Sequence, residues 1–423
     1  MIVVTLLHAL ALASQDARFT EHLIAKIPEA SAVHDPTGSA ADVLEHRCAW
    51  SPDGTRVAWV ATVDGVVHAA EGDTIGTAFA ELEAPIFADD GSHYAFRGLL
   101  GDGGASWVVE LDGEEVAKND FIGPLAFAPD GGGLGFWEVE GEDGRLVRLD
   151  TTNHSRWKSG RPVSLVDRAA GLPRFSRDGK RMIAEAKGAE EHVLVLATRS
   201  SAKVVVAEED WISAPQLSPD GREFAYVQYD TKSDPARSYA VRGKKRLGTS
   251  MDRSGFGCYS PDGDHYAYTV SRGGLAGLAI DKDSSAKTAY YAVIDVAWAP
   301  ASDRVAFVTN YDGPSLVVSN GEQYEESGGM WFVVNRAVGT DGGEEGPGFV
   351  EVADPVFSPA GDHLAYRARR GLRWSIVVDG QLSEIYDEVG PPCFSADGTR
   401  VAFGARKGRE LWWKVMEVES GIR

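Results

Sequence analysis

One ten-residue phrase returns nine times along the 423 residues of this chain and constrains its fold more than any other feature. The phrase runs from a residue that is usually aromatic, through a stretch close to Ser-Pro-Asp-Gly and two polar residues, to a triplet that usually has a central alanine, as in residues 50–59. Its copies lie from 37 residues (Trp50 to Phe87) to 59 residues (Trp298 to Phe357) apart, a period typical of propeller blades rather than helical solenoids. The copies begin at Trp50, Phe87, Phe127, Phe175, Leu217, Tyr259, Trp298, Phe357 and Phe394.

Each copy predicts a β-hairpin. Proline sets φ at the first central position of the turn, and glycine accepts the positive φ that follows. Ala301-Ser302 replaces Asp-Gly in the seventh copy, so we expect a different turn there. In the triplet, period-two geometry places Val57 and Trp59 on one face of a strand and Ala58 on the other. Apolar residues on both faces indicate a strand packed between two neighbouring blades.

A second hairpin signal follows in several copies. Two β-branched residues lead into Asp-Gly at residues 377–380 and into Asn-Gly at residues 317–321, and both dipeptides favour tight hairpin loops. We therefore expect four strands in each unit, with residues 317–321 in the second hairpin of the seventh.

The predicted fold is all-β, a single β-propeller of about eight or nine four-stranded blades. Nine blades would make an unusually large ring, so eight blades with one displaced unit are the alternative. The last unit has only one further strand, at residues 410–418, whereas residues 19–27 have the alternation of an outer strand. We predict that this N-terminal strand closes the ring and removes two open edges. The expected division is a signal peptide at 1–13, a segment with the closing strand at 14–47, and the propeller at 48–423.

The Ser-Pro-Asp-Gly phrase resembles the repeat of the TolB-like propeller family, an architectural relative of the WD-repeat proteins, over about residues 48 to 423. The resemblance implies a propeller fold. None of the 11 tryptophans is followed by aspartate, so the WD signature itself is absent, and the N-terminal α/β domain of TolB is not expected. A similar propeller caps prolyl-oligopeptidase-type hydrolases, but the chain contains no Gly-x-Ser-x-Gly pentapeptide.

The first residues predict export. Residues 1–15 form a short apolar segment with an Ala-x-Ala ending, the pattern of a signal peptide cleaved after Ala13. The first basic residue is Arg18, which leaves a buried strand as the alternative interpretation. We expect a periplasmic or secreted protein, with a cytoplasmic one as the alternative. No other stretch is long and apolar enough to span a membrane.

Residue spacing argues against metal and cofactor chemistry. The three cysteines, Cys48, Cys258 and Cys393, are widely separated and predict neither a zinc site nor a disulfide framework. His93, His265 and His363 share one repeat position that other copies fill with arginine or glutamate, which indicates a solvated strand start. The turn aspartates are expected to bond their own backbone. We predict no metal, no cofactor and no catalytic residue.

The charge of the chain narrows the class of partner. The net charge is −21, from 63 acidic and 42 basic residues, and such a chain repels nucleic acid and anionic membrane surfaces. A protein, peptide or saccharide is therefore the expected partner, and the oligomeric state is left open.

Two segments interrupt the repeat, and loops inserted on a rigid scaffold are where binding residues gather. Residues 335–348, in the seventh unit, are acidic and rich in glycine, whereas residues 153–162, in the third unit, form a basic patch around a tryptophan. Tryptophan and arginine are enriched among interface residues. The candidate partner contacts are Arg156, Trp157, Lys158 and Arg161, and the alternative is a loop whose tryptophan packs onto a blade edge.

The predicted function is that of a non-catalytic binding or scaffold propeller that uses loops on one face. Two alternatives are open. The first is a hydrolase or lyase with its site in the mouth of the propeller channel, built from residues of different blades. The second is a structural ring in a larger assembly, which would show a large exposed apolar patch.

Overall fold

Every regular element in the described part of the chain is a β-strand. The structure is a computed structural model that describes residues 19–33, 47–101, 106–157, 160, 162–188, 191–248, 251–282, 288–311, 315–319, 322–326, 330–338 and 343–418. It contains no helix that could cross a membrane within these residues. The antiparallel strands form the successive blades of an all-β propeller, as predicted.

The chain divides into two compact units, and the first contains the described residues from 19 to 209 and from 402 to 415. It holds blades 1 to 4 together with β41, β42 and β1 of blade 9. Its strands are β1 (His22–Lys26), β2 (Ala32–Val33), β3 (Cys48–Trp50), β4 (Val57–Val63), β5 (Val66–Glu71), β6 (Thr74–Phe79), β7 (Glu81–Leu82), β8 (Ile86–Phe87), β9 (Tyr94–Leu99), β10 (Trp107–Leu111), β11 (Glu114–Asn119), β12 (Phe121–Ile122), β13 (Ala126–Phe127), β14 (Gly133–Glu140), β15 (Asp143–Asp150), β16 (Val163–Ala170), β17 (Arg174–Phe175), β18 (Arg181–Gly188), β19 (His192–Thr198), β20 (Ser201–Glu208), β41 (Arg400–Lys407) and β42 (Glu410–Glu417).

The second unit contains the described residues from 210 to 401 and from 416 to 418. It holds blades 5 to 8, followed by the short strands that precede β41. Its strands are β21 (Ile212–Leu217), β22 (Phe224–Asp230), β23 (Arg237–Arg242), β24 (Lys245–Leu247), β25 (Arg253–Tyr259), β26 (Tyr266–Arg272), β27 (Leu275–Ile280), β28 (Thr288–Tyr290), β29 (Ala292–Trp298), β30 (Arg304–Asn310), β31 (Ser315–Ser319), β32 (Glu322–Glu326), β33 (Phe332–Ala337), β34 (Glu344–Glu345), β35 (Glu351–Phe357), β36 (Leu364–Arg370), β37 (Arg373–Val378), β38 (Gln381–Leu382), β39 (Glu388–Val389) and β40 (Cys393–Phe394).

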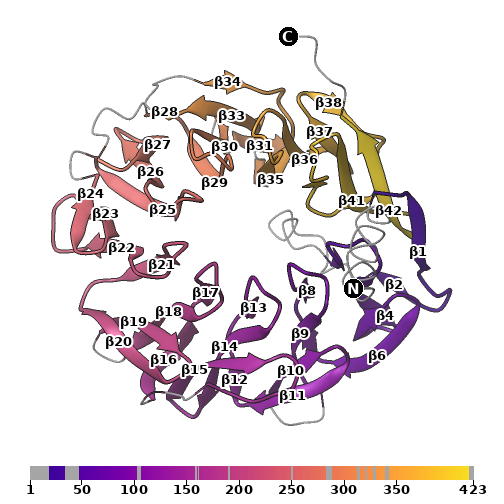
Figure 1. The fold of residues 1–423 in the computed structure, drawn as a ribbon, viewed down its shortest axis with the longest axis horizontal. Helices are drawn as coiled ribbons and strands as arrows, with labels where there is room; N and C mark the ends of the chain where they lie inside the picture. Colours follow the sequence, from indigo (N-terminus) through magenta and orange to yellow (C-terminus); the bar gives the residue numbers. More distant parts are fainter. Residues whose placement is uncertain are drawn as a thin grey trace, which may run out of the picture. The chain divides into compact units, whose positions relative to one another are not determined.

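Within each unit the blades stand side by side, and their first strands lie on the concave side, as β8, β13 and β17 show in one unit and β21, β25 and β29 in the other (Figure 1). The first strand of a blade is broken or irregular. In blades 1 to 4 it consists of two segments that pair with the same second strand, and in blades 5 to 8 it carries a change of register. The described strands therefore form nine blades, β16 being shared by blades 3 and 4.

The repeated turn folds as the sequence predicted. In blade 1, Ser51 Oγ donates to Asp53 Oδ1 at 2.5 Å, and Thr55 N donates to the same oxygen at 3.1 Å. Gly54 follows with φ of 74°, a conformation that side chains rarely adopt. The carboxylate therefore bonds its own turn, as expected of aspartate here.

The expectation of a different turn in the seventh copy is wrong. Ser302 adopts φ of 62° at the position where the other copies have glycine, and its N–H donates to Ala299 O at 2.9 Å as in the glycine turns. Its hydroxyl lies 3.4 Å from Asp262 N in the neighbouring blade. This contact helps to stabilise a backbone conformation that is unfavourable for a residue other than glycine.

The triplets bury both faces of the second strand. Val57, Ala58 and Trp59 are fully buried, and side chains from two neighbouring blades share each core cluster. The alanine lets the next blade approach closely, whereas the larger residues fill the space on the other side. This packing confirms the interpretation of the triplet as a strand between two blades.

The predicted N-terminal closing strand is present. β1 pairs antiparallel with β42, with His22 opposite Trp413 and Lys26 opposite Glu410. Trp413 also packs over the turn of blade 1, where a Cβ added at Gly54 would lie only 2.4 Å from its ring. The proposed signal peptide at 1–13 lies outside the described residues.

The insertion in blade 7 is not where the sequence placed it. The hairpin at residues 317–321 was predicted to belong to the blade, but β31 and β32 pair only with each other. The third strand of the blade is β33, which pairs with β30, and its fourth strand is β34. Val317-Val318 in β31 and Val333-Val334 in β33 look alike in sequence. Only the pairing with β30 shows that β33 is the strand that belongs to the blade.

Candidate functional site

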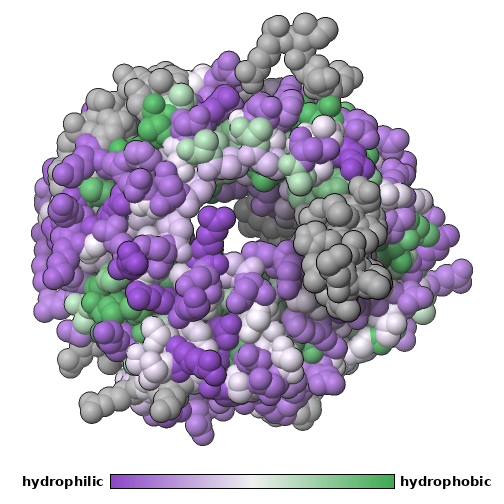
Figure 2. Space-filling model, viewed as in Figure 1, coloured by the Kyte–Doolittle hydropathy of each residue, from purple (hydrophilic) through white to green (hydrophobic). Residues whose placement is uncertain are grey.

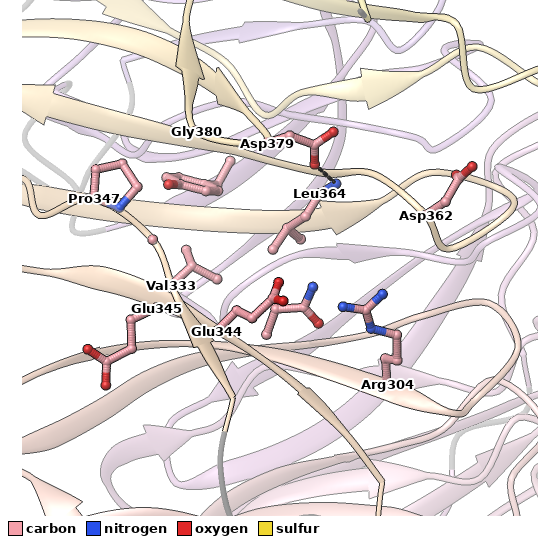
Figure 3. Close-up of a pocket in the computed structure, with 12 residues that line it drawn as sticks. Arg304, Val333, Glu344, Glu345, Pro347, Asp362, Leu364, Asp379 and Gly380 are labelled. Atoms are coloured by element: carbon pink, nitrogen blue, oxygen red, sulfur yellow. Dashed lines mark hydrogen bonds between the residues drawn. The ribbon is translucent and has the colours of Figure 1, made fainter. Parts of the chain in front are cut away.

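A cavity of about 560 Å³ lies between blades 7 and 8. This volume is in the range of ligand sites. Figure 3 shows Arg304 and Glu344 on the side of blade 7 and Asp362, Leu364 and Asp379 on the side of blade 8. The cavity is lined by Arg304, Val333, Asn335, Glu344, Glu345, Gly346, Pro347, Asp362, Leu364, Tyr366, Asp379 and Gly380.

Strand pairing brings these residues together. Arg304 begins β30, and Asn335 lies on β33, opposite Ala306. The segment that enters and leaves β34 supplies the residues from Glu344 to Pro347. Five of the twelve lining residues therefore come from the acidic segment 335–348 that interrupts the repeat in the sequence. Residues 339–342 of that segment lie outside the described residues.

Asp379 is held in place by its own blade. It occupies the turn after β37 with φ of 49°, and its Oδ1 accepts a hydrogen bond from Leu364 N at 2.9 Å. His363 Nδ1 lies 2.5 Å from Oδ2 of the same carboxylate. Both contacts turn the carboxylate toward the start of β36.

The same arrangement occurs in blades 2 and 6, and it adds a hydrogen-bond partner for each histidine. His93 Nδ1 lies 2.5 Å from Asp112, and His265 Nδ1 lies 2.7 Å from Asp281. Each histidine lies partly exposed directly before its strand and is also bonded to the turn aspartate of its own blade. The sequence did not show this because the two partners lie 16 to 19 residues apart on different strands.

In two interfaces an arginine of the preceding blade completes the arrangement, and we name this contact the interblade latch. Between blades 1 and 2, Arg56 Nε donates to Glu71 Oε1 at 2.6 Å on its own blade, and its Nη2 reaches Asp112 Oδ1 at 3.3 Å on the next. The guanidinium also lies 4.9 Å from the ring centroid of Tyr94, a favourable cation–π distance.

The latch between blades 5 and 6 has the same geometry with its charges exchanged. Glu223 occupies the position of Arg56 in the repeat. Arg242 occupies the position of Glu71, because Arg242 lies opposite Ala225 as Glu71 lies opposite Ala58. Arg242 Nε donates to Glu223 Oε2 at 2.8 Å, and its Nη1 donates to Asp281 Oδ1 at 3.1 Å. An arginine thus links the two blades whichever strand carries it.

Between blades 7 and 8 the latch is open. Arg304 occupies the position of Arg56 and Asp379 that of Asp112, but Asn335 stands in the position of Glu71. Within the described residues, the guanidinium of Arg304 makes no hydrogen bond or ion pair, and Asn335 Oδ1 is buried without a partner. The amide of Asn335 has no charge with which to form an ion pair with Arg304. This difference explains why the latch is open between blades 7 and 8 and closed between blades 1 and 2 and between blades 5 and 6.

A second polar group of the cavity also lacks a partner. Among the described residues no group hydrogen-bonds the buried hydroxyl of Tyr366, and this residue is only 3% exposed. Burial, together with the nearby Asp379 carboxylate, raises the pKa of this phenol. At the equivalent position of blade 6, Tyr268 OH donates to Asp281 O at 3.0 Å. A buried polar group without a partner is costly, and Tyr366 is one of several such groups among the described residues.

The charge of the cavity differs from that of its counterpart. It is lined by four carboxylates and one guanidinium, whereas the cavity of about 490 Å³ between blades 5 and 6 is lined by three carboxylates and four cationic groups, among them Lys244, Lys245 and Lys282. The cavity between blades 7 and 8 is therefore the acidic one of the two.

Most of the surface in view is hydrophilic, with small separate hydrophobic areas (Figure 2).

Two of the four predicted contact residues of blade 3 lie in the described structure, and both contact other residues of the propeller. Arg156 Nη1 donates to Glu138 Oε2 at 2.7 Å, and the half-buried Trp157 packs against the core with the Arg148 guanidinium 4.8 Å from its ring centroid. Lys158 and Arg161 lie outside the described residues. The partner contact predicted for this loop stays a prediction.

Other candidate groups show no site chemistry in the described residues. No group of three or more His, Cys, Asp and Glu side chains is arranged to hold a metal ion there. Cys48 is buried, and burial raises the pKa of the Cys258 thiol to about 12, which leaves it a poor nucleophile at neutral pH.

No protein-family model matches the chain. No curated protein matches it either. Similar solved structures include TolB from Acinetobacter baumannii (15% identity, 88% of this chain and 79% of that chain covered, TM-score 0.33) and a putative TolB from Agrobacterium tumefaciens (19%, 56% and 83%, TM-score 0.32). Another is the β-propeller domain of the Trilobed protease from Pyrococcus furiosus (13%, 67% and 94%, TM-score 0.39).

These similarities are too weak to bear on function. The propeller fold stands on the strand pairing of the blades, and TolB proteins are among the similar structures, as the repeat indicated. The strand pairing confirms the propeller fold that the resemblance implied, and the resemblance reaches no further.

Proposed function

We propose that the chain is a non-catalytic binding propeller whose ligand site is the cavity between blades 7 and 8. The observation that carries this proposal is the buried hydroxyl of Tyr366, which lines the cavity and has no partner among the described residues. Folded proteins satisfy nearly all such groups. A ligand that supplies the missing hydrogen bond would explain why the group is kept.

The open latch supports the same proposal. Arg304 and Asn335 line the cavity with polar groups that no described residue bonds. In the two closed latches the equivalent groups bond each other and the next blade. Groups that are already positioned and have no partner require no rearrangement to bind a ligand.

The test is a binding screen with defined libraries, a displayed random-peptide library and a saccharide array. The pocket variant carries Asn335→Ala and Glu344→Ala, which remove two cavity side chains without opening the core. The matched control carries Lys244→Ala and Lys245→Ala at the cavity of blades 5 and 6. We expect ligands of the wild type to be lost in the pocket variant and kept in the control. Ligands kept by both variants would refute the cavity as the site.

The loop of blade 3 is a second proposed contact, carried over from its basic composition. An Arg156→Ala variant enters the same screen. Loss of protein-sized or peptide ligands in this variant alone would place the partner contact on blade 3, and retention of every ligand would count against it.

We also propose that the chain is exported, in the periplasm or outside the cell. The apolar segment with its Ala-x-Ala ending supports this proposal. N-terminal sequencing of the protein isolated from its native host tests it. A mature chain that begins at Ser14 is expected, and an intact Met1 would contradict the proposal.

A further inference from the structure

The two closed latches show which chemical group belongs at the open one. In both, Oδ1 of the turn aspartate accepts two hydrogen bonds, one from a backbone N–H and one from an arginine. Asp112 Oδ1 accepts from Tyr94 N at 3.1 Å and from Arg56 at 3.3 Å. Asp281 Oδ1 accepts from Tyr266 N at 3.0 Å and from Arg242 at 3.1 Å.

At the open latch only half of this pattern is present. Asp379 Oδ1 accepts from Leu364 N at 2.9 Å, but no arginine bonds it in the described structure. Asn335 Oδ1 lies where Glu71 accepts the Nε–H of Arg56, and it has no donor. Two acceptors that bind a guanidinium in the equivalent interface are therefore left for another group.

The charge of the lining selects the same chemistry. The carboxylates of Glu344, Glu345, Asp362 and Asp379 outnumber the single guanidinium of Arg304, and the whole chain carries a net charge of −21. An anionic ligand would be repelled, whereas a planar cation with several N–H donors matches carboxylate acceptors in fixed geometry.

We propose that the cavity of blades 7 and 8 binds a guanidinium group, presented by an arginine side chain of a partner peptide, which bonds Asp379 and Asn335 as Arg56 bonds Asp112 and Glu71. This inference rests on the proposed function, because it names the ligand of that same cavity. The ligand thereby completes the latch that the chain's own arginine leaves open.

Isothermal titration calorimetry with three small probes tests the inference. N-acetyl-arginine amide carries the cation, N-acetyl-citrulline amide has nearly the same shape without charge, and N-acetyl-glutamate amide carries the opposite charge. We expect the arginine probe to bind and the citrulline probe to bind about tenfold more weakly or worse, since a charge-assisted hydrogen bond exceeds a neutral one by roughly this factor. Equal binding of the two probes would overturn the inference.

A variant that closes the latch gives a second, independent readout. Asn335→Glu restores the residue of blade 1, so we expect Arg304 to pair with it and reach Asp379. Affinity for the arginine probe should then fall about tenfold or more, even though the substitution adds negative charge. Unchanged or tighter binding would contradict the latch argument. The matched control is Lys244→Ala, which should leave the affinity unchanged.

The source of the guanidinium and the proposed function are tested separately. A peptide with an internal arginine that binds more tightly than the amide probe identifies a peptide partner, whereas equal affinities would overturn the peptide assignment and leave a small guanidinium compound. If the glutamate probe or a neutral saccharide binds instead, and the pocket variant abolishes that binding, the proposed function stands and the guanidinium inference is wrong.

Discussion

Replacing Tyr366 by phenylalanine should stabilise the protein in the absence of ligand. Folding removes water from the Tyr366 hydroxyl, and the structure returns no hydrogen bond for it. Leaving such a group buried costs about 1–3 kcal/mol. The phenyl ring fits at this position of the repeat, since Phe96, Phe307 and Phe403 occupy it in other blades with at most 2% exposure. Part of the gain is lost to the small void left by the oxygen, so we expect a net stabilisation of about 0.5–2 kcal/mol.

Tyr268→Phe is the matched control. This tyrosine occupies the same repeat position in blade 6, is fully buried, and donates to Asp281 O at 3.0 Å. Its removal should destabilise the protein by about 0.5–1.5 kcal/mol, because a satisfied hydrogen bond is lost and the carbonyl loses a donor.

Urea denaturation of the wild type and the two variants measures both effects, and the sign of the change is decisive. We expect the free energy of unfolding to rise for Tyr366→Phe and to fall for Tyr268→Phe. If both variants lose stability to a similar extent, the hydroxyl of Tyr366 is satisfied in solution, and the reasoning that singles out the cavity fails.

Three further predictions concern the scaffold. Glu71→Asn should open the first latch and lower the free energy of unfolding by about 1 kcal/mol. This value is below that of a fully buried charged hydrogen bond because Arg56 and Glu71 are about a third exposed. Urea denaturation measures the change. The Ser395 hydroxyl and the backbone of the turn lower the pKa of Asp397 to about 2, so this carboxylate stabilises the fold above its ordinary pKa and loses that contribution as the pH falls through about 2. Ser395→Ala should therefore be more destabilising at pH 5 than at pH 2, and a pH-independent difference in the denaturation midpoint would contradict this. Trp59→Ala should cost about 3–5 kcal/mol because the side chain is fully buried, and a loss below 1 kcal/mol by the same assay would show that the blades do not pack as described.

The parts of the fold that depend on local chemistry were predictable from sequence. The turn has glycine in every copy except the seventh, and it is followed by a strand with apolar residues on both faces. The structure around Gly54 and Trp59 therefore follows from their immediate neighbours in the sequence. The pairing of β1 with β42 was predictable for a related reason, since a unit with a missing strand leaves an open edge that only the other end of the chain can cover.

The candidate site was less predictable because it depends on register. The sequence alone does not show that Asn335 is equivalent to Glu71 of blade 1. The pairing of Asn335 opposite Ala306 shows this equivalence. Residues 317–321 have a stronger turn signal than the residues around β33. The sequence analysis therefore assigned them to the blade, whereas β31 and β32 form the insertion. The unusual length of the seventh unit was the signal available in the sequence, and it pointed to the right blade without identifying Arg304 or Tyr366.

Because β1 pairs with β42, blade 9 can form completely only after both of these strands have been synthesised. Lys414 Nζ bonds Glu21 Oε1 at 2.6 Å across 393 residues of sequence. At roughly 5–20 residues per second of synthesis, about 20 to 80 s separate the two partners. During this time β1 is an unpaired edge of the kind that attracts other strands. Its charged Lys26 and its short length of five residues are the features that protect a nascent edge from such pairing until β42, the last of the described strands, has been made.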